Sequence, residues 1–253
     1  MRDVARHNLR HRELSIQVGL NGFSFVVFDV GRAAEGRGVD ARDAIVRAAA
    51  YRETDMASIL AQEPMLTTTT PPLGRVFVGC ATDNVLLVPQ SLFEPERAEQ
   101  YLTAANMYVP GMTTLSNNLI SSQAAAVWQV DSGIAAVLLQ LYPAALFYHP
   151  LLLELEATPN DCVQVVLDGE VAHVTVAHRG LYAAETMRVD TPEELLYYVQ
   201  KLLKNDGFTT YRIVLTGEGV GRLQEFFGRY FGEVDAREVK FYNHQRVREL
   251  CVL

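Results

Sequence analysis

The sequence carries one short pattern twice, once in each half of the chain. The two copies are Gln17-Val18-Gly19-Leu20-Asn21-Gly22 and Gln164-Val165-Val166-Leu167-Asp168-Gly169. Each is an alternating apolar run that ends in Asn-Gly or Asp-Gly. These dipeptides tolerate a positive φ and favour the two-residue turn of a β-hairpin. Because each half opens with the same kind of hairpin, the pattern predicts a duplicated fold with two lobes.

Length and composition fit two lobes with buried cores. The chain has 253 residues, enough for two lobes of roughly 100–150 residues. Hydrophobic residues make up 49% and charged residues 21%, a balance typical of globular proteins rather than disordered chains. The net charge of −8 argues against a broad nucleic-acid surface, since phosphate binding draws on clustered Lys and Arg.

One basic cluster lies in residues 1–13. It consists of Arg2, Arg6, His7, Arg10, His11 and Arg12. A nucleic-acid or membrane arm has such a composition, but no aromatic residue is interleaved, so a flexible N-terminal arm is favoured. The longest apolar run, 134–139 with its flanks, is far too short to span a bilayer, and no signal-peptide core is found. We therefore expect a cytoplasmic protein without a membrane span.

The first lobe is expected to cover residues 14–158, with strands and helices in mixed order. Strands are predicted at 14–20, 23–30, 119–122, 125–130 and 144–148, and a second hairpin at 75–81 and 85–88. Helices are predicted at 41–61, 95–106 and 132–141, with a weaker helical signal at 150–157. The signals are apolar periodicity, the capping residue Asp40 and the helix-starting proline Pro95.

The second lobe is expected to cover residues 159–253, after the boundary Thr158-Pro159-Asn160-Asp161. Strands are predicted at 163–167, 171–177, 181–187, 211–216 and 237–242. Helices are predicted at 192–204, after the capping box Thr191-Pro192-Glu193-Glu194, and at 220–230. A hairpin, a third strand and then helical crossovers to parallel strands give the order of a ribonuclease-H-like lobe.

Duplicated lobes of this order resemble the superfamily of actin, the sugar kinases and the heat-shock-70 ATPases. Four groups of residues narrow the likeness: Leu14-Ser15-Ile16-Gln17-Val18, Gly22-Phe23-Ser24-Phe25, Leu87-Val88-Pro89 with Leu92-Phe93, and Thr191-Pro192-Glu193-Glu194 with Leu196-Tyr197-Tyr198. These motifs resemble an uncharacterised family found mainly in Bacteroides-type bacteria and described as having an actin-like ATPase fold. The resemblance implies an α/β fold with mixed five-stranded sheets flanked by helices.

The same resemblance implies where a nucleotide site would lie. Active members of the superfamily place nucleotide between the lobes, with phosphate and metal at an Asp-x-Gly turn in the first hairpin of each lobe. Here Gln17 and Gln164 stand in place of the aspartates, and a neutral amide serves neither as a base nor as an anionic metal ligand. The candidate interlobe cleft consists of Gln17, Gly19, Asn21, Gly22, Gln164, Asp168 and Gly169, with no catalytic residue and no metal assigned.

A second candidate element is the turn Thr216-Gly217-Glu218-Gly219, between a predicted strand and a predicted helix. Such a turn lets backbone approach an adenosine or a phosphate, and it resembles the adenosine motif of the superfamily. Glu218 separates the two glycines and would repel an anion. A plain strand-to-helix turn is the alternative, and Asp168 before Gly169 is likewise either a turn former or a metal ligand.

Three functions follow as hypotheses. The favoured one is a non-catalytic binding protein with a degenerate nucleotide site, whose partner is another protein or itself, and no cofactor is expected. The second is an ATPase or phosphotransferase that binds ATP with magnesium through Asp29, Asp168 or Glu218. The third is a cytoplasmic assembly scaffold similar to the actin-related proteins of division and pilus machines.

Overall fold

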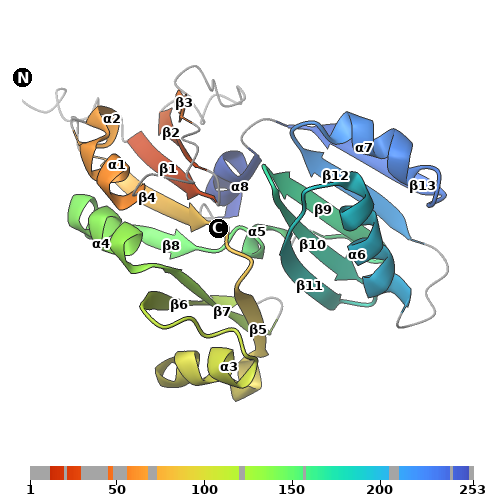
Figure 1. Ribbon diagram of the computed structural model, residues 1–253, viewed down its shortest axis with the longest axis horizontal. Helices are drawn as coiled ribbons and strands as arrows, with labels where there is room; N and C mark the ends of the chain where they lie inside the picture. Colours follow the sequence, from red (N-terminus) through yellow and green to blue (C-terminus); the bar gives the residue numbers. More distant parts are fainter. Residues whose placement is uncertain are drawn as a thin grey trace, which may run out of the picture.

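Three sheets organise the molecule. The computed structural model describes residues 12–19, 22–29, 45–47, 56–67, 73–119, 123–155, 158–204, 211–239 and 242–250. Within these residues there are two five-stranded sheets and one three-stranded sheet. The two larger sheets lie side by side, and the small sheet lies beneath the first of them in the view of Figure 1.

The first sheet contains the first hairpin. Its strands are β1 (Arg12–Val18), β2 (Phe23–Asp29), β3 (Ile45–Arg47), β4 (Leu73–Cys80) and β8 (Leu146–Tyr148). Their order is β3-β2-β1-β4-β8, with β1 antiparallel to β2 and parallel to β4. Alternate β1 residues, among them Leu14 and Ile16, are buried on one face. They share a core with α1 (Met56–Gln62) and α4 (Ser132–Leu141).

The second sheet repeats this connection. Its strands are β9 (Cys162–Asp168), β10 (Val171–Ala177), β11 (Leu181–Arg188), β12 (Arg212–Gly217) and β13 (Glu233–Glu238). Their order, β11-β10-β9-β12-β13, matches that of the first sheet strand for strand. Two helices, α6 (Pro192–Lys204) and α7 (Val220–Phe227), complete its core through Leu195, Val199 and Phe227. The predicted duplicated α/β fold with two ribonuclease-H-like sheets is therefore confirmed.

The third sheet is inserted between β4 and β8. It consists of β5 (Val85–Pro89), β6 (Met112–Leu119) and β7 (Ala124–Asp131) in the order β5-β7-β6. The short helices η3 (Gln90–Leu92) and η4 (Pro95–Arg97) lead from β5 into α3 (Ala98–Ala104). Leu102 of α3 packs against Val88 and Val127 in a small core of its own. The remaining short helices of the first half are α2 (Pro64–Thr67) and α5 (Leu152–Leu155).

The predicted second hairpin at 75–81 and 85–88 is wrong. β4 pairs with β1 in the first sheet, whereas β5 pairs with β7 in the third. The chain leaves one sheet for the other at Asn84, whose side-chain amide donates to the Met107 carbonyl at 2.5 Å and to Gln129 Oε1 at 3.1 Å. These bonds attach the segment to the third sheet, so no tight turn closes between β4 and β5.

Three other predicted elements differ from the structure. The predicted helix at 41–61 is wrong at Ile45–Arg47, which forms β3 beside β2 because sheet pairing overrides a weak helical pattern. Only the end of that range, α1, is helical. Most of 41–55 lies outside the described residues. The predicted strand at 119–122 is the last residue of β6, beyond which 120–122 are not described. The strand at 237–242 is wrong, since β13 ends at Glu238 and a helix, α8 (Tyr242–Leu250), follows.

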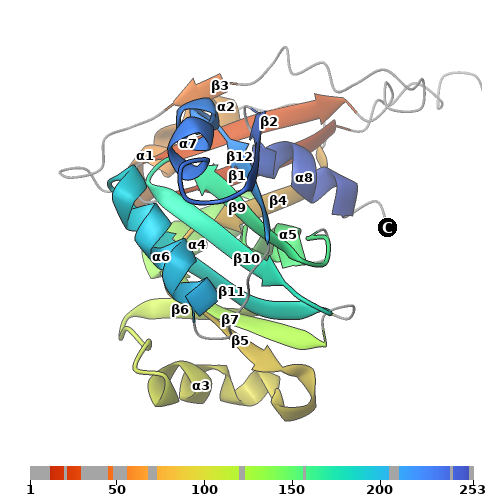
Figure 2. The same ribbon diagram turned by 90° about the vertical axis from the view of Figure 1, so that its right-hand side faces the viewer.

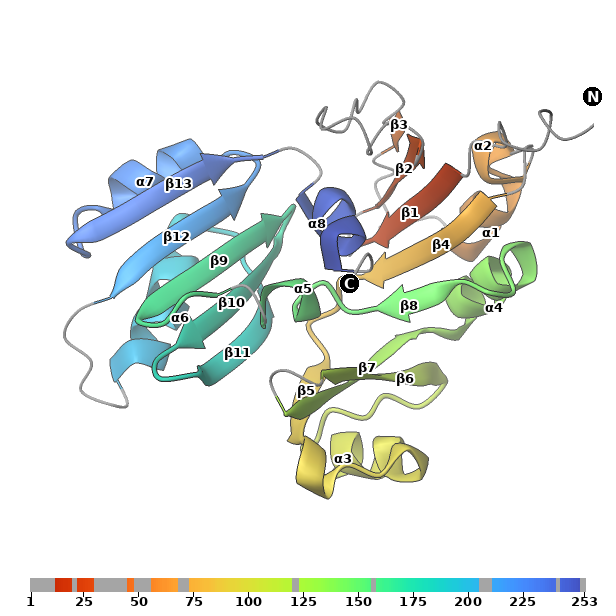
Figure 3. The same ribbon diagram turned by 180° about the vertical axis from the view of Figure 1, so that it is seen from behind.

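Helix α8 contacts both large sheets. Figure 3 shows it between them, and its His244 is buried with Nδ1 2.8 Å from Ser15 Oγ and Nε2 2.8 Å from Ser24 Oγ. On the other side Asn243 Nδ2 donates to Asp168 Oδ2 at 2.9 Å. The division into lobes 14–158 and 159–253 stays a prediction, and α8 contacts the first sheet although it follows the second in sequence.

A second contact between the sheets is built from aromatic rings. His149, after β8, lies edge-on to His173 of β10 with ring centroids 5.6 Å apart, and Trp128 of β7 lies 5.8 Å from His149. All three side chains are buried. His149 Nε2 lies 2.8 Å from the Thr82 carbonyl oxygen, and His173 Nδ1 lies 2.9 Å from Thr186 Oγ1. Figure 2, turned by 90°, shows β10 and β11 above the strands of the third sheet.

Because three histidines are buried, we expect the free energy of unfolding to decrease in mild acid. Burial lowers the pKa of His149 to about 4 and that of His244 to about 3, and it lowers the pKa of His173 well below 6.5. The unfolded chain therefore binds more protons below about pH 6.5, and the free energy of unfolding decreases by up to about 1.4 kcal/mol per pH unit for each histidine down to about pH 4. Urea unfolding followed by Trp128 fluorescence measures this slope.

The variant His244→Gln should reduce that slope by the contribution of one proton. The control Val247→Ala lies on the same helix, removes buried apolar volume and leaves every imidazole in place. It should lower the free energy of unfolding equally at each pH and keep the slope. An unchanged slope in His244→Gln would contradict the assignment of His244 as a buried neutral imidazole.

Candidate functional site

Gln17, at the end of β1, is folded against its own sheet. Its side chain is 5% exposed and its Nε2 donates to the hydroxyl of Tyr148, the last residue of β8. The amide lies directly over Gly79 of β4, where a Cβ would overlap it. Its Oε1 is buried and has no hydrogen-bond partner among the described residues. The residue that stands in for the first-lobe aspartate is thus packed between three strands of the first sheet.

Gln164 occupies the equivalent place in the second sheet. It is also 5% exposed, and its Nε2 donates to Thr216 Oγ1 of the neighbouring strand β12 at 2.9 Å. It lines a cavity of about 390 Å³, together with Cys162, Arg212, Arg237, Tyr242 and others. No hydrogen bond within the described part of the chain joins Gln17 and Gln164. Each glutamine is thus bonded within its own sheet.

Asp168 and Gly169 form the turn between β9 and β10. Gly169 has a φ of +63°, as the turn requires. Asp168 is half-buried and accepts the hydrogen bond from Asn243 Nδ2. Burial raises the pKa of Asp168, the hydrogen bond from Asn243 opposes the rise, and the negative charge of Glu218 adds to it. Asp168 is thus a turn residue that also bonds to α8.

The turn Thr216-Gly217-Glu218-Gly219 leads into α7 as predicted. Gly217 has a φ of +133°, and a Cβ there would lie 2.5 Å from the Leu167 carbonyl oxygen, so only glycine fits. The Gly219 amide donates to Glu238 Oε1 at 2.5 Å, and the Gly221 amide donates to Glu238 Oε2 at 3.3 Å. A helix N-terminus attracts anions, and here the carboxylate of Glu238, at the end of β13, takes that position.

The first-lobe turn lies beside another cavity. The Gly19 amide donates to the Gly22 carbonyl at 2.8 Å and closes the turn, while Asn21 between them lies outside the described residues. Gly19 lines a cavity of about 400 Å³ together with Val18, Cys80, Thr82, Asp131 and others. Burial raises the pKa of Cys80 to about 12, so its thiol stays protonated at neutral pH. Nothing is described of the Asp29 side chain.

These residues do not fit a magnesium nucleotide. Mg²⁺ is held by carboxylate or water oxygens bridged to phosphate, whereas the hairpin ends present two amides with internal partners and one carboxylate bonded to Asn243. The helix N-terminus that would face a phosphate already carries Glu238. In the described part of the chain no three His, Cys, Asp or Glu side chains are grouped as a metal site.

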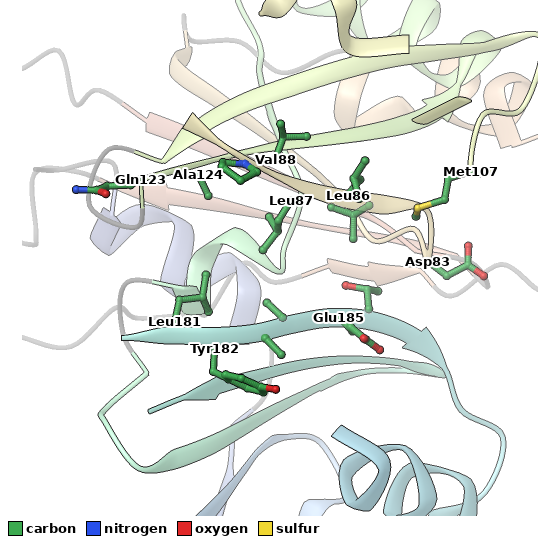
Figure 4. Close-up of a pocket in the computed structure, with 15 residues that line it drawn as sticks. Asp83, Leu86, Leu87, Val88, Met107, Gln123, Ala124, Leu181, Tyr182 and Glu185 are labelled. Atoms are coloured by element: carbon green, nitrogen blue, oxygen red, sulfur yellow. The ribbon is translucent and has the colours of Figure 1, made fainter. Parts of the chain in front are cut away.

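A larger cavity, of about 630 Å³, lies between the third and second sheets (Figure 4). Its walls are β5 and β11, and none of the candidate residues from the sequence lines it. Sequence reasoning missed this cavity because it forms where two distant strands meet. It also missed Tyr148, Asn243, His244 and Glu238, whose roles depend on contacts between segments far apart in the chain.

No helix within the described ranges combines the length and the apolar character that crossing a bilayer demands. The comparison with curated proteins gave no match. Among solved structures, the chain is similar to a Bacteroides thetaiotaomicron protein with an actin-like ATPase fold and unknown function. The TM-score is 0.78 at 17% identity, covering 94% of this chain and 95% of that one.

Two further structures share the fold at greater distance. One is the cytoplasmic domain of EpsL, an inner membrane component of the type II secretion system of Vibrio cholerae, with a TM-score of 0.52 and 12% identity over 95% of each chain. The other is the ethanolamine utilization protein EutJ from Carboxydothermus hydrogenoformans, with a TM-score of 0.52 and 11% identity over 93% of this chain and 86% of that one. At such identities the likeness concerns the fold.

The family comparison covers most of the chain. The model of a family of proteins of unknown function, DUF3822, matches residues 3–218. With the duplicated sheets and the structural likeness, this match makes the chain a member of the DUF3822 family with an actin-like ATPase fold.

Proposed function

We propose that this protein is a non-catalytic member of the actin-like superfamily that acts by binding another protein. The observation that carries the proposal is the state of Gln17, which replaces the expected carboxylate and whose amide is bonded to Tyr148 over Gly79. A nucleotide-binding relative would need a charged oxygen free to face the ligand at this point. Here the polar group is used to join β1 to β8.

The other candidate residues also support a site that does not bind a magnesium nucleotide. Gln164 is bonded to Thr216, and Asp168 is bonded to Asn243. A phosphate at the start of α7 would have to displace the carboxylate of Glu238, and Glu218 would add repulsion. Binding MgATP would therefore break several internal hydrogen bonds, and each buried polar group left unsatisfied costs about 1–3 kcal/mol.

Structural neighbours lend support to a role in protein assemblies. The cytoplasmic domain of EpsL, which shares the fold, belongs to a component of a secretion system. A scaffold role of this kind needs no ligand between the lobes, so the residues there can form hydrogen bonds within the chain. The lobe surfaces and sheet edges would then carry the function, as they do in proteins that bind through exposed strands.

An ATPase or phosphotransferase is the alternative, and one observation favours it. Asp168 and Glu218 lie near enough for the charge of Glu218 to raise the pKa of Asp168. Two neighbouring carboxylates are a feature of metal-dependent phosphate chemistry. The alternative requires that Asp168 leave Asn243 and that a metal ion bind both carboxylates.

Differential scanning fluorimetry with ATP and magnesium chloride distinguishes the two functions. A nucleotide present at about 100 times its dissociation constant stabilises a protein by about 2.7 kcal/mol, which for a chain of this size raises Tm by roughly 5–10 °C. We expect no shift. A shift of that size that is lost in Asp168→Asn would overturn the proposal and establish nucleotide binding, and magnesium chloride alone is the control for a metal effect.

The packing of Gln17 on Gly79 predicts a measurable coupling between these residues. Gly79→Ala places a methyl group where the Gln17 amide lies, and we expect it to lower the free energy of unfolding by about 1–3 kcal/mol. Combining it with Gln17→Ala removes the overlap. The double variant should therefore be less destabilised than the sum of the two single variants by on the order of 1 kcal/mol.

Urea unfolding of the wild type, both single variants and the double variant measures this cycle. Gly111→Ala supplies a comparison, because no atom lies within 4 Å of a Cβ there and its cost arises from a φ of +84° alone. Gly111→Ala should show no coupling to Gln17→Ala. Additive effects for Gly79→Ala and Gln17→Ala would show that Gln17 does not occupy the space over Gly79.

A further inference from the structure

The cavity of about 390 Å³ beside Gln164 lies on one face of the second sheet. It is lined by Cys162 and Gln164 of β9, Arg212 of β12 and Arg237 of β13. The residues that alternate with these along each strand face α6 and α7 and belong to the core of that sheet. The cavity is therefore on the opposite face, where residues of α5 and α8 complete its lining. We call it the arginine cavity.

The arginine cavity lies at the other end of β9 from the turn that the sequence singled out. Cys162, which lines the cavity, is the first residue of β9, whereas Asp168 is the last and bonds to Asn243. Of the candidate residues from the sequence, Gln164 lines the cavity. A ligand in the arginine cavity would therefore occupy a different site from a nucleotide held at the hairpin turns.

Three arginines from three different elements line this one cavity: Arg212 of β12, Arg237 of β13 and Arg246 of α8. A guanidinium group carries a permanent positive charge, five donors and no acceptor. Like charges placed around one cavity repel each other, and an anion bound among them removes that cost. Burial raises the pKa of the Cys162 thiol, and the charges of Arg212 and Arg237 oppose the rise. The positive charge of both side chains therefore acts on the lining of the cavity.

The two carboxylates that line the cavity already have partners within the chain. Glu154 is buried and accepts a hydrogen bond from the Tyr242 hydroxyl at 2.8 Å. Asp161 Oδ1 lies 2.5 Å from His178 Nδ1. With three guanidinium groups and two carboxylates, the lining keeps a net positive charge. An anion bound beside the arginines would leave both of these internal bonds in place.

Arg237 is the arginine that has donors to offer to a ligand. Arg212 donates two hydrogen bonds to Asp235 and its Nε lies 3.3 Å from Glu233 Oε1, so its charge is shared with β13. Arg237 is exposed and forms no ion pair with any residue that the structure describes. A ligand oxygen therefore reaches Arg237 without displacing a carboxylate of the protein.

We propose that the arginine cavity binds a small molecule through a carboxylate or phosphate group, to which Arg237 and Arg246 donate. A guanidinium group can donate two parallel N–H bonds to two oxygens of either group. Asn160 and Gln164 line the same cavity with amide groups, which suit the uncharged polar part of such a molecule. The cavity volume lies within the range of about 300–1,000 Å³ typical of small-molecule sites. This site goes beyond the protein-binding function proposed above and does not depend on it.

Backbone amide NMR shifts of the isotope-labelled protein test the proposal. Sodium phosphate or disodium succinate is titrated into the full chain, and sodium chloride keeps the ionic strength constant. We expect saturable shifts in the segments that line the cavity, at 160–164, 212–214, 237 and 242–246. Saturation by phosphate assigns a phosphate group to the ligand, and saturation by succinate assigns a carboxylate group. Shifts that grow without saturation for both anions would indicate an adventitious ion only and would overturn the site.

Two arginine variants identify the residue that binds the anion. Arg237→Gln removes the donors and should weaken binding of the saturating anion at least about tenfold. Arg222→Gln is the matched control, because Arg222 is an exposed arginine of α7, on the other face of the same sheet, and its loss changes the net charge equally. Arg222→Gln should bind the anion like the wild type. Equal affinity in Arg237→Gln and the wild type would contradict the assignment.

A further variant separates a specific contact from a general attraction of charge. Arg237→Lys keeps the positive charge but loses the planar fork of donors, so its affinity should fall between those of the wild type and Arg237→Gln. Saturable shifts confined to segments away from the cavity would place the anion elsewhere and overturn the proposal. Neither probe is a nucleotide, so failure here leaves the proposed protein-binding function standing. A shift of Tm with MgATP that is lost in Asp168→Asn would overturn that function and leave the arginine cavity standing.

Discussion

The hydrogen bonds of His244 hold the architecture together. The imidazole is buried between Ser15 of β1 and Ser24 of β2, and the preceding residue, Asn243, bonds to Asp168 of the second sheet. One short segment of α8 therefore touches the first hairpin of both halves. Burial in this place disfavours the charged imidazolium and lowers the pKa of His244 to about 3, so the ring is neutral at ordinary pH. The β1–β2 hairpin of the first sheet and the end of β9 in the second are thus both bonded to α8.

Much of the second half could be predicted from sequence because its signals are local. The strands β9, β10 and β11 have strong alternating or continuous apolar runs separated by turn residues, and α6 begins at a capping box with a proline. The first half is harder to predict, because the residues of a strand do not specify which other strand it pairs with. β4 and β5 are neighbours in the chain and belong to different sheets. Ile45-Val46-Arg47 has an ambiguous pattern that β2 resolves by pairing with it.

The candidate site could also be predicted from the sequence only in part. The replacement of the two expected aspartates by glutamine was visible in the sequence, and so was the glycine turn before α7. The partners of these residues were not, because Gln17 and Tyr148 lie far apart in the chain, as do Gly219 and Glu238. The spacing of residues within a motif does not indicate which distant side chain forms a hydrogen bond with them. That the amide of Gln17 bonds to Tyr148 is therefore known only from the tertiary structure.

The aromatic contact of Trp128, His149 and His173 has a mechanical consequence. Two bodies joined along one line can rotate about it as a hinge, but a second attachment away from that line removes the rotation. α8 makes one attachment and the edge-on rings make the other. We therefore expect the two attachments to restrain the angle between the large sheets, and with it the width of the gap between β5 and β11. Such a surface is preorganised, so a ligand loses its own freedom on binding while the protein loses little.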